Sequence, residues 1–272
     1  MRMASIPTNW GNHFFPVVFM SWIQTVLFLG LVGLATFCQN LTGFAFGLIF
    51  VGIAGATHLL SIEDAANIAC LLGIVNGVVY LRAHRVRPDW QLLRPMLLSS
   101  VIGLVAGVAL LQWLSGNALN VLRMLLGAAI VLCALLLIQQ AKPVAASRSA
   151  APMWLAGISS GLLGGLFATP GPPMVYYLYR QPIDALVARQ CLFVLFIVSG
   201  VLRLGMVSVQ GELGSSVLMA SALACPVVAG VTWAQAKWPP VWPRRVVQWL
   251  VCLLLLLSGA SLLISGWLAR AA

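Results

Sequence analysis

Apolar residues run through this chain in ten stretches separated by short polar connections. The first five cover residues 17–38, 43–60, 65–81, 95–114 and 119–138, and the second five cover residues 153–168, 172–179, 185–209, 215–236 and 246–267. A hydrocarbon core about 30 Å thick takes roughly 20 apolar residues in a helix. Most of the stretches are long enough to cross it, so the pattern predicts an all-α polytopic membrane protein.

The stretch around residues 168–177 is not compatible with a continuous helix. Pro170, Pro172 and Pro173 fall within four positions and remove three backbone donors. Proline suits the first turn of a helix, so a new helix is predicted to begin near Pro172 or Pro173. It has about eight residues before Arg180, or roughly 12 Å. We therefore predict a re-entrant hairpin whose tip lies inside the membrane and whose free N–H groups, around Thr169 and Gly171, bind an anion.

The two sets of five stretches resemble each other. Residues 105–108 (VAGV) recur as residues 228–231, and Asp64-Ala65 recurs as Asp184-Ala185. The first-half counterpart of the proline-rich break is residues 39–47, where Thr42 is a candidate N-cap for a helix that begins at Gly43. An ordinary turn stays open as an alternative there, because residues 43–60 are long enough to span.

The repeat divides the chain into four parts: an N-terminal segment (1–20), a first repeat (21–138), a cytoplasmic linker (139–151) and a second repeat (152–268). Each repeat is predicted to hold one re-entrant, broken helical hairpin and three transmembrane helices. An odd number of crossings per half inverts the second half relative to the first. Such inverted repeats bind substrate near the midplane, between broken helices.

Charge refines this picture. The chain has 272 residues, of which 61% are hydrophobic and 7% charged, and a net charge of +10. Lysine and arginine gather in short loops, which indicates cytoplasmic loops and argues against a nucleic-acid partner. The five carboxylates sit at loop edges: Glu63, Asp64, Asp89, Asp184 and Glu212. Neither a proton relay, a metal site, a cofactor nor an enzyme centre is predicted from this distribution.

Two arginines are the strongest candidates for an anion site. Arg189 and Arg203 are 14 residues apart, which leaves them about 40° apart on one helix face. Arginine inside a span is a candidate functional residue, although snorkelling to the nearer interface is the alternative. Asn76 either binds substrate or bonds a neighbouring helix, and Asn67, on roughly the opposite face, ranks lower. The predicted substrate-binding residues are Asn40, Thr42, Gly43, Gly47, Asn76, Thr169, Gly171, Pro172, Tyr177, Arg189 and Arg203.

The two breaks resemble those of the TauE/SafE family of sulfite exporters. The resemblance rests on residues 42–48 (TGFAFGL) and 169–173 (TPGPP), together with Asp89-Trp90, Ala188-Arg189 and Arg203-Leu204, and it covers about residues 31–263. It implies export of sulfite, or of an organic anion such as a sulfonate, across the bacterial inner membrane, with the breaks and arginines lining the route.

The sequence leaves several alternatives open. An ion-coupled anion importer, a membrane-embedded enzyme and an assembly factor are the competing functions. The identity of the anion, proton coupling against voltage drive, and a homodimer in the bilayer are also open. Small-residue spacings, such as that of Gly103 and Gly107, indicate close helix packing.

Overall fold

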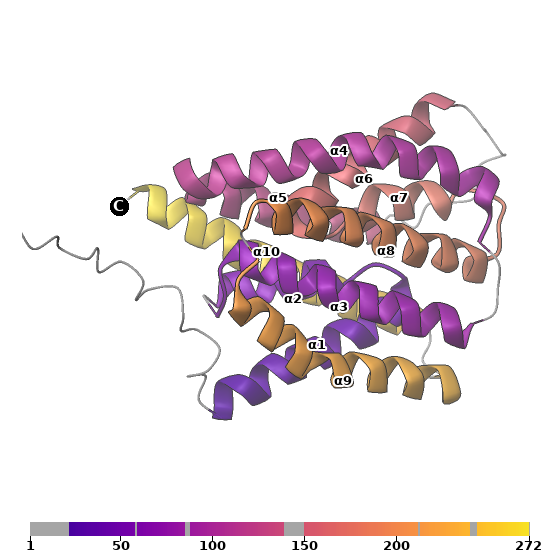
Figure 1. Cartoon of the computed structure of the whole chain (residues 1–272), viewed down its shortest axis with the longest axis horizontal. Helices are drawn as coiled ribbons and strands as arrows, with labels where there is room; N and C mark the ends of the chain where they lie inside the picture. Colours follow the sequence, from indigo (N-terminus) through magenta and orange to yellow (C-terminus); the bar gives the residue numbers. More distant parts are fainter. Residues whose placement is uncertain are drawn as a thin grey trace, which may run out of the picture.

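The structure is a computed structural model that describes residues 22–57, 59–84, 88–138, 150–211, 213–239 and 244–271. Regular structure in these residues is all helical, as Figure 1 shows. The first half contains α1 (Trp22–Thr42), α2 (Phe46–Ala56), α3 (Ile62–Ala83), α4 (Trp90–Asn117) and α5 (Leu119–Ile138). The second half contains α6 (Ala150–Phe167), α7 (Gly171–Leu178), α8 (Ala185–Val209), α9 (Ser215–Lys237) and α10 (Arg244–Ala271).

The helices have the lengths that a polytopic membrane protein requires. Within the described residues, α1, α3, α4, α8 and α9 are each long and apolar enough to cross a bilayer, and α5 and α10 contain 20 and 28 residues. The predicted class of an all-α polytopic membrane protein is confirmed. The predicted N-terminal segment (1–20) lies outside the described residues, and so does most of the linker (139–151); α6 already begins at Ala150.

Polar residues set the starts of two helices. The Ser61 hydroxyl accepts a hydrogen bond from the Asp64 N–H (3.0 Å) at the start of α3. The Asp89 carboxylate accepts from the N–H groups of Gln91 and Leu92 at the start of α4. Each side chain satisfies donors that the first helical turn leaves unpaired. Short caps of this kind let the chain reverse direction within a few residues.

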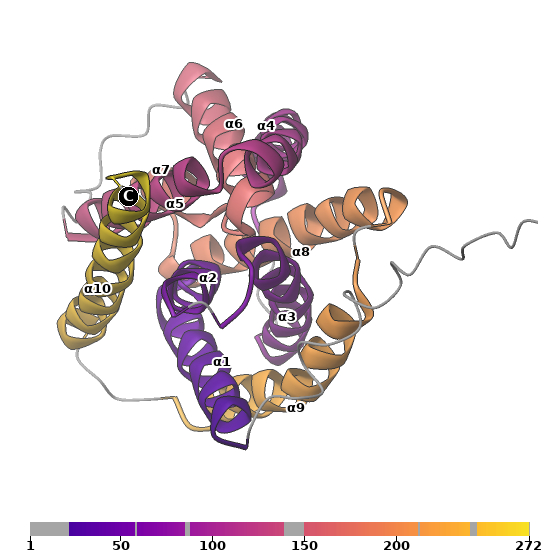
Figure 2. The same ribbon diagram turned by 90° about the vertical axis from the view of Figure 1, so that its left-hand side faces the viewer.

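The packing of one half reappears in the other when the halves are exchanged. Helix α1 packs on α9 as α6 packs on α4, α2 packs on α10 as α7 packs on α5, and α3 packs on α9 as α8 packs on α4. Helices α3 and α8 pack on each other, and so do α5 and α10. Figure 2 shows α4 beside α6, and α1, α2 and α3 gathered together.

Figure 1 shows where the chain turns. Helices α3, α7 and α9 finish and α4, α8 and α10 begin at the right-hand end, and α2, α4 and α8 finish and α3, α5 and α9 begin at the left-hand end. Helix α1 begins and α2 finishes at the left-hand end, whereas α6 begins and α7 finishes at the right. Arg82, Arg94, Arg180 and Lys237 lie at or next to the helix ends on the right, whereas Arg123 lies near the start of α5 on the left.

Helices α4 and α6 meet with their backbones in contact. A Cβ atom added at Gly103 or Gly107 of α4 would lie within 3.0 Å of backbone atoms of α6. The same holds in the other direction for Gly161 and Gly165 of α6. Glycine is required at these positions because backbone atoms cannot rotate away as a side chain can. The spacing of Gly103 and Gly107 therefore serves packing within one chain.

Candidate functional site

The first break lies between α1 and α2. Gly43 has a φ of +90° and donates its N–H to the carbonyl of Gln39 (2.6 Å), which is the left-handed cap that ends many helices. The prediction that Thr42 caps a helix beginning at Gly43 is wrong. Thr42 is the last residue of α1, and its hydroxyl donates to the carbonyl of Cys38 (2.8 Å). Helix α1 ends at Thr42 because the chain reverses direction through the left-handed conformation of Gly43.

Helix α2 begins at Phe46 and contains 11 residues, about 16 Å. It is too short to cross the hydrocarbon core. The structure therefore favours a broken hairpin in the first half over a spanning helix. No side chain caps the start of α2, and the N–H groups of Phe46, Gly47 and Leu48 have no backbone acceptor in the described part of the chain. These three groups are available to a ligand.

The second break has the same geometry. Ala168 has a φ of +56° and donates its N–H to the carbonyl of Gly164 (2.9 Å). Helix α7 begins at Gly171, close to the predicted start at Pro172 or Pro173, and has eight residues. One detail differs from expectation. The prolines remove two of the first three N–H groups of α7, so only that of Gly171 is left to bind an anion.

The two breaks meet. Gly47 packs against Thr169 so closely that an added Cβ would lie within 3.0 Å of the threonine methyl group. A Cβ added at Gly171 would lie 2.6 Å from the Cβ of Phe44. The structure thus brings Gly43, Gly47, Thr169 and Gly171 into one neighbourhood, although about 120 residues separate the two pairs.

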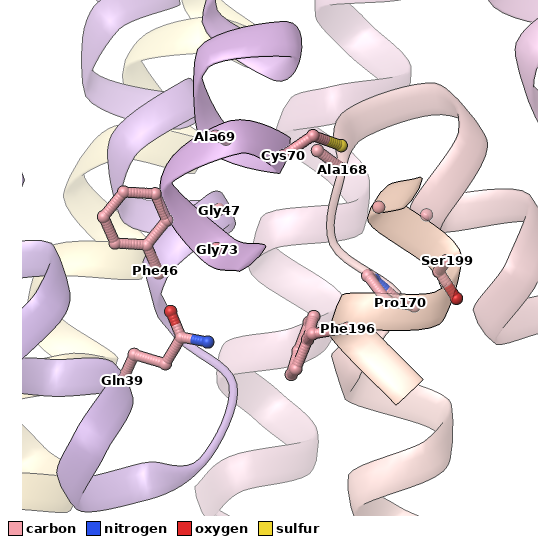
Figure 3. A pocket seen from close by; sticks show the side chains of 12 residues that line it. Gln39, Phe46, Gly47, Ala69, Cys70, Gly73, Ala168, Pro170, Phe196 and Ser199 are labelled. Atoms are coloured by element: carbon pink, nitrogen blue, oxygen red, sulfur yellow. The ribbon is translucent and has the colours of Figure 1, made fainter. Parts of the chain in front are cut away.

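A cavity lies beside the meeting point (Figure 3), with about 350 Å³ of empty space including its opening. Its lining comes from α1, α2, α3, α6, α8 and the second break: Gln39, Phe46, Gly47, Ala69, Cys70, Gly73, Gly164, Ala168, Pro170, Phe196, Ser199 and Gly200. Figure 3 shows Gln39 on one side of the space and Phe196 and Pro170 on the other.

Polar atoms without partners surround the cavity. The Gln39 Oε1 and Thr169 Oγ1 atoms are buried and make no hydrogen bond within the described part of the chain, and both side chains are 1% exposed. Buried polar groups are normally paired. The Ser160 hydroxyl donates to the Pro170 carbonyl and ties the second break to α6. The orphaned atoms, with the free N–H groups of α2, describe a site that a polar ligand would complete.

Arg203 lies behind Cys70, which is one of the residues that line the cavity. Its side chain is 1% exposed. The Nε group donates to the Gly165 carbonyl (3.0 Å), and Nη1 donates to Asn67 Oδ1 (2.5 Å) and lies 3.7 Å from Cys70 Sγ. Nη2 has no partner. Arg203 follows the lining residue Gly200 by almost one turn of α8, so the guanidinium stands next to the cavity.

Arg189 occupies the opposite side of the first break. A Cβ added at Gly43 would lie 3.4 Å from Arg189 Cγ. The guanidinium is within hydrogen-bonding reach of the hydroxyl groups of Tyr80 and Tyr179, and its Nε makes no hydrogen bond. The Tyr179 hydroxyl donates to the carbonyl of Thr42 (3.2 Å). Arg189 therefore stands beside the first break, and neither arginine of α8 is among the residues that line the cavity.

Asn40 and Asn76 belong to a separate polar cluster between α1, α3 and α9. Asn40 Nδ2 donates to Thr232 Oγ1 (2.9 Å) and Gln235 Oε1 (2.7 Å), and the Thr232 hydroxyl donates to Asn76 Oδ1 (2.5 Å). Asn40 Oδ1 and Asn76 Nδ2 are left without partners. Asn76 was predicted either to bind substrate or to form a hydrogen bond with a neighbouring helix. The structure shows the hydrogen bond.

Pro172 and Tyr177 lie on α7, and both are buried. The Tyr177 hydroxyl makes no hydrogen bond. Neither residue lines the cavity itself.

The sequence analysis does not select Gln39, Cys70 and Ser199, and it ranks Asn67 below Asn76 because the two lie on roughly opposite faces of one helix. Helix α3, however, packs on both α8 and α9. Asn67 faces Arg203 of α8 while Asn76 faces Thr232 of α9. An apolar helix with one polar residue on each of two opposite faces is expected to pack between two other helices. That pattern could have indicated the position of α3.

Comparisons with known proteins agree on one protein family. The family model described as "Sulfite exporter TauE/SafE" matches residues 27–262. A protein of Cupriavidus necator named "Probable sulfite/organosulfonate exporter TauE" is 30% identical over 240 residues, which is 87% of this chain and 94% of that protein. No solved structure matches the chain.

Proposed function

The chain belongs to the TauE/SafE family of sulfite exporters, and on that premise we propose that it exports sulfite or a small organosulfonate through the cavity between its two broken helices. The family resemblance noted in the motifs is confirmed by a match over most of the chain. The protein acts as a transporter and not as an enzyme in this proposal. The proposed location of the protein is the bacterial inner membrane. Reactions of sulfonates in the cytoplasm would supply the anion.

The buried guanidinium of Arg203 is the observation that carries the proposal. A buried cation is costly unless an opposite charge or full hydrogen bonding compensates it. Its three partners are neutral, and one of its nitrogens is unpaired. A passing anion would supply the missing charge. The free N–H groups at the start of α2 add a partial positive charge from the other side.

An inverted repeat explains how both membrane faces reach this cavity. In support of it, the packing of α1 on α9 matches that of α6 on α4, and the two hairpins begin at opposite ends of the molecule (Figure 1). Arg82, Arg94, Arg180 and Lys237 lie at or near the end where α6 begins, whereas Arg123 and Arg270 lie toward the other end. The positive-inside rule makes that end cytoplasmic.

The membrane potential is sufficient to drive export. An inside-negative potential moves each negative charge outward with about 2.3 kcal/mol per 100 mV. A coupling ion is therefore not required by the energetics of export, although uptake would need one.

The test is flux of a radiolabelled anion in proteoliposomes under an imposed voltage. Wild-type protein is expected to move sulfite and the organosulfonate isethionate and to respond to the voltage. Arg203→Ala and Pro172→Leu are expected to abolish flux while the protein stays folded, as judged by size-exclusion chromatography. Arg94→Ala is the matched control, because Arg94 is exposed at the start of α4.

Two results would contradict the proposal. One is wild-type protein that moves neither anion at any voltage. The other is normal flux by both site variants, which would remove Arg203 and the second break from the route. If Arg203→Ala does not fold, Arg203→Lys keeps the charge but loses the planar fork, and it should transport more slowly than wild type.

A further inference from the structure

Aromatic rings fill the space between α3 and α8 on one side of the cavity. The Tyr80 ring stacks on the Phe193 ring, with 4.0 Å between the centroids, and on the His84 ring at 4.2 Å. Tyr80 and Phe193 are both buried. Phe193 precedes the lining residue Phe196 by almost one turn of α8, and Tyr80 follows the lining residue Gly73 by about two turns of α3. Both rings therefore lie between the cavity and the end where α3 finishes and α8 begins, which the positive-inside rule makes cytoplasmic (Figure 1).

Arg189 connects this stack to the first break. Its guanidinium is within hydrogen-bonding reach of the hydroxyl groups of Tyr80 and Tyr179. The Tyr179 hydroxyl in turn donates to the carbonyl of Thr42 (3.2 Å), the last residue of α1. One arginine side chain thus joins α8, α3, the end of α7 and the first break.

The contacts of this cluster are of a kind that can be released. The partners found for Arg189 are neutral hydroxyl groups, and its Nε atom is buried without a hydrogen bond in the described part of the chain. A carboxylate would hold the guanidinium more strongly, through charge-assisted hydrogen bonds. The other bond between the two helices here runs from the Gln190 amide to the His84 carbonyl (2.9 Å) and is also uncharged. These bonds can therefore break together when the end of α3 moves away from α8.

From this arrangement we propose that Tyr80 and Phe193 form the inner gate of the transport route, and that Arg189 and Tyr179 hold it closed. The inference rests on the proposed function and deepens it. With the rings stacked, the cavity is closed toward the cytoplasm between α3 and α8. An anion enters from the cytoplasm after the hydroxyl contacts have opened and the rings have separated. Arg189 and Tyr179 are positioning residues, because they act on the route through the rings.

The Cys70 thiol can report on the gate. Of the six cysteines, all of which lie in the described residues, Cys70 alone lines the cavity. A chain that keeps Cys70 and has alanine at the other five positions is treated with membrane-impermeant 2-sulfonatoethyl methanethiosulfonate, in inside-out and in right-side-out vesicles. Tyr179→Phe removes one hydroxyl and keeps the ring. Loss of a hydrogen bond to a charged group shifts an equilibrium by about tenfold or more. Modification of Cys70 should therefore become about tenfold faster from the cytoplasmic face and no faster from the outer face.

Tyr176→Phe is the matched control. Tyr176 lies on α7 three residues before Tyr179 and is half-buried like it, but its hydroxyl accepts a hydrogen bond from Arg180 (2.8 Å). This variant should leave both modification rates unchanged. Phe193→Leu removes one ring of the stack and should raise the cytoplasmic rate as Tyr179→Phe does.

The concentration of isethionate that gives half-maximal flux is the second measurement, made on the chain with its native cysteines. A larger population of protein open to the cytoplasm lowers this concentration at the cytoplasmic face, and it does not lower it at the outer face. Tyr179→Phe should therefore reach half-maximal flux at a lower concentration from the cytoplasmic face alone. A merely structural role for Tyr179 would change the two faces alike.

The outcomes separate the gate from the proposed function. The gate is overturned by folded Tyr179→Phe and Phe193→Leu chains that show the parent rate of Cys70 modification at the cytoplasmic face, or an equal rise at both faces. If the single-cysteine chain does not fold, the half-maximal concentrations decide, and equal changes at the two faces overturn the gate. Absence of flux for every anion in wild-type protein would instead contradict the proposed function.

Discussion

Replacing Gly47 by alanine adds one methyl group at the point where the two breaks touch. The new Cβ would lie within 3.0 Å of the methyl group of Thr169 and 3.0 Å from the Ala168 carbonyl oxygen. Ordinary carbon–carbon contacts begin at about 3.5 Å. Thr169 is itself 1% exposed, so its side chain has little room to move. One break must therefore shift by about an ångström relative to the other.

Overpacking of this kind costs about 1–3 kcal/mol. For a chain of this size, 2 kcal/mol corresponds to a fall of roughly 4–8 °C in the thermal midpoint. We expect Gly47→Ala to show that fall in detergent, together with a loss of anion flux in proteoliposomes, because the N–H groups at the start of α2 move with the backbone. Gly205→Ala is the matched control, since a Cβ at Gly205 meets nothing within 4 Å.

A second substitution makes the reasoning refutable. Thr169→Ser removes the clashing methyl group and keeps the hydroxyl, so the double variant Gly47→Ala/Thr169→Ser should recover at least half of the lost midpoint. The interaction energy from the double-mutant cycle measures the contact directly. An unchanged midpoint and flux in Gly47→Ala, or no recovery in the double variant, would show that the breaks do not touch as described.

Two further substitutions test the backbone at the breaks and between helices. Ala168→Gly should raise the thermal midpoint by about 1–3 °C, because a non-glycine residue at a φ of +56° costs about 1–2 kcal/mol and glycine loses only part of that gain through entropy in the unfolded chain. A lower midpoint would count against the left-handed turn. Gly161→Ala should sharply reduce the yield of folded protein, because the added Cβ would meet the Ser100 carbonyl of α4 within 3.0 Å. Yield equal to that of Gly30→Ala, where a Cβ has space, would refute it.

Most helix limits could be read from the sequence. Apolar length and clustered prolines are local signals, and the helix from Ala185 to Val209 was predicted to the residue. The first break was misplaced because two local rules compete at neighbouring positions. Thr42 suits the start of a helix, whereas Gly43 suits the residue after its end. The left-handed φ of Gly43 shows which rule prevails.

The candidate site could be predicted only in part. Arg203 was identifiable because a charge in an apolar segment is costly wherever that segment lies. Its partners Asn67 and Cys70 were not, because they depend on how α3 sits between α8 and α9. Likewise, the loss of N–H groups in α7 was readable from the prolines, but the closeness of Gly47 to Thr169 required the tertiary structure.

The contact between α4 and α6 limits how the transporter can change shape. Neither helix can slide or rotate against the other without a clash of main-chain atoms, so the two helices form one rigid unit. Its counterpart, α1 against α9, is joined instead by hydrogen bonds from the Asn40 amide to the Thr232 hydroxyl and the Gln235 amide oxygen, and these side chains can exchange partners. Any movement that opens the cavity to one face and then to the other would therefore hinge along the α1–α9 side.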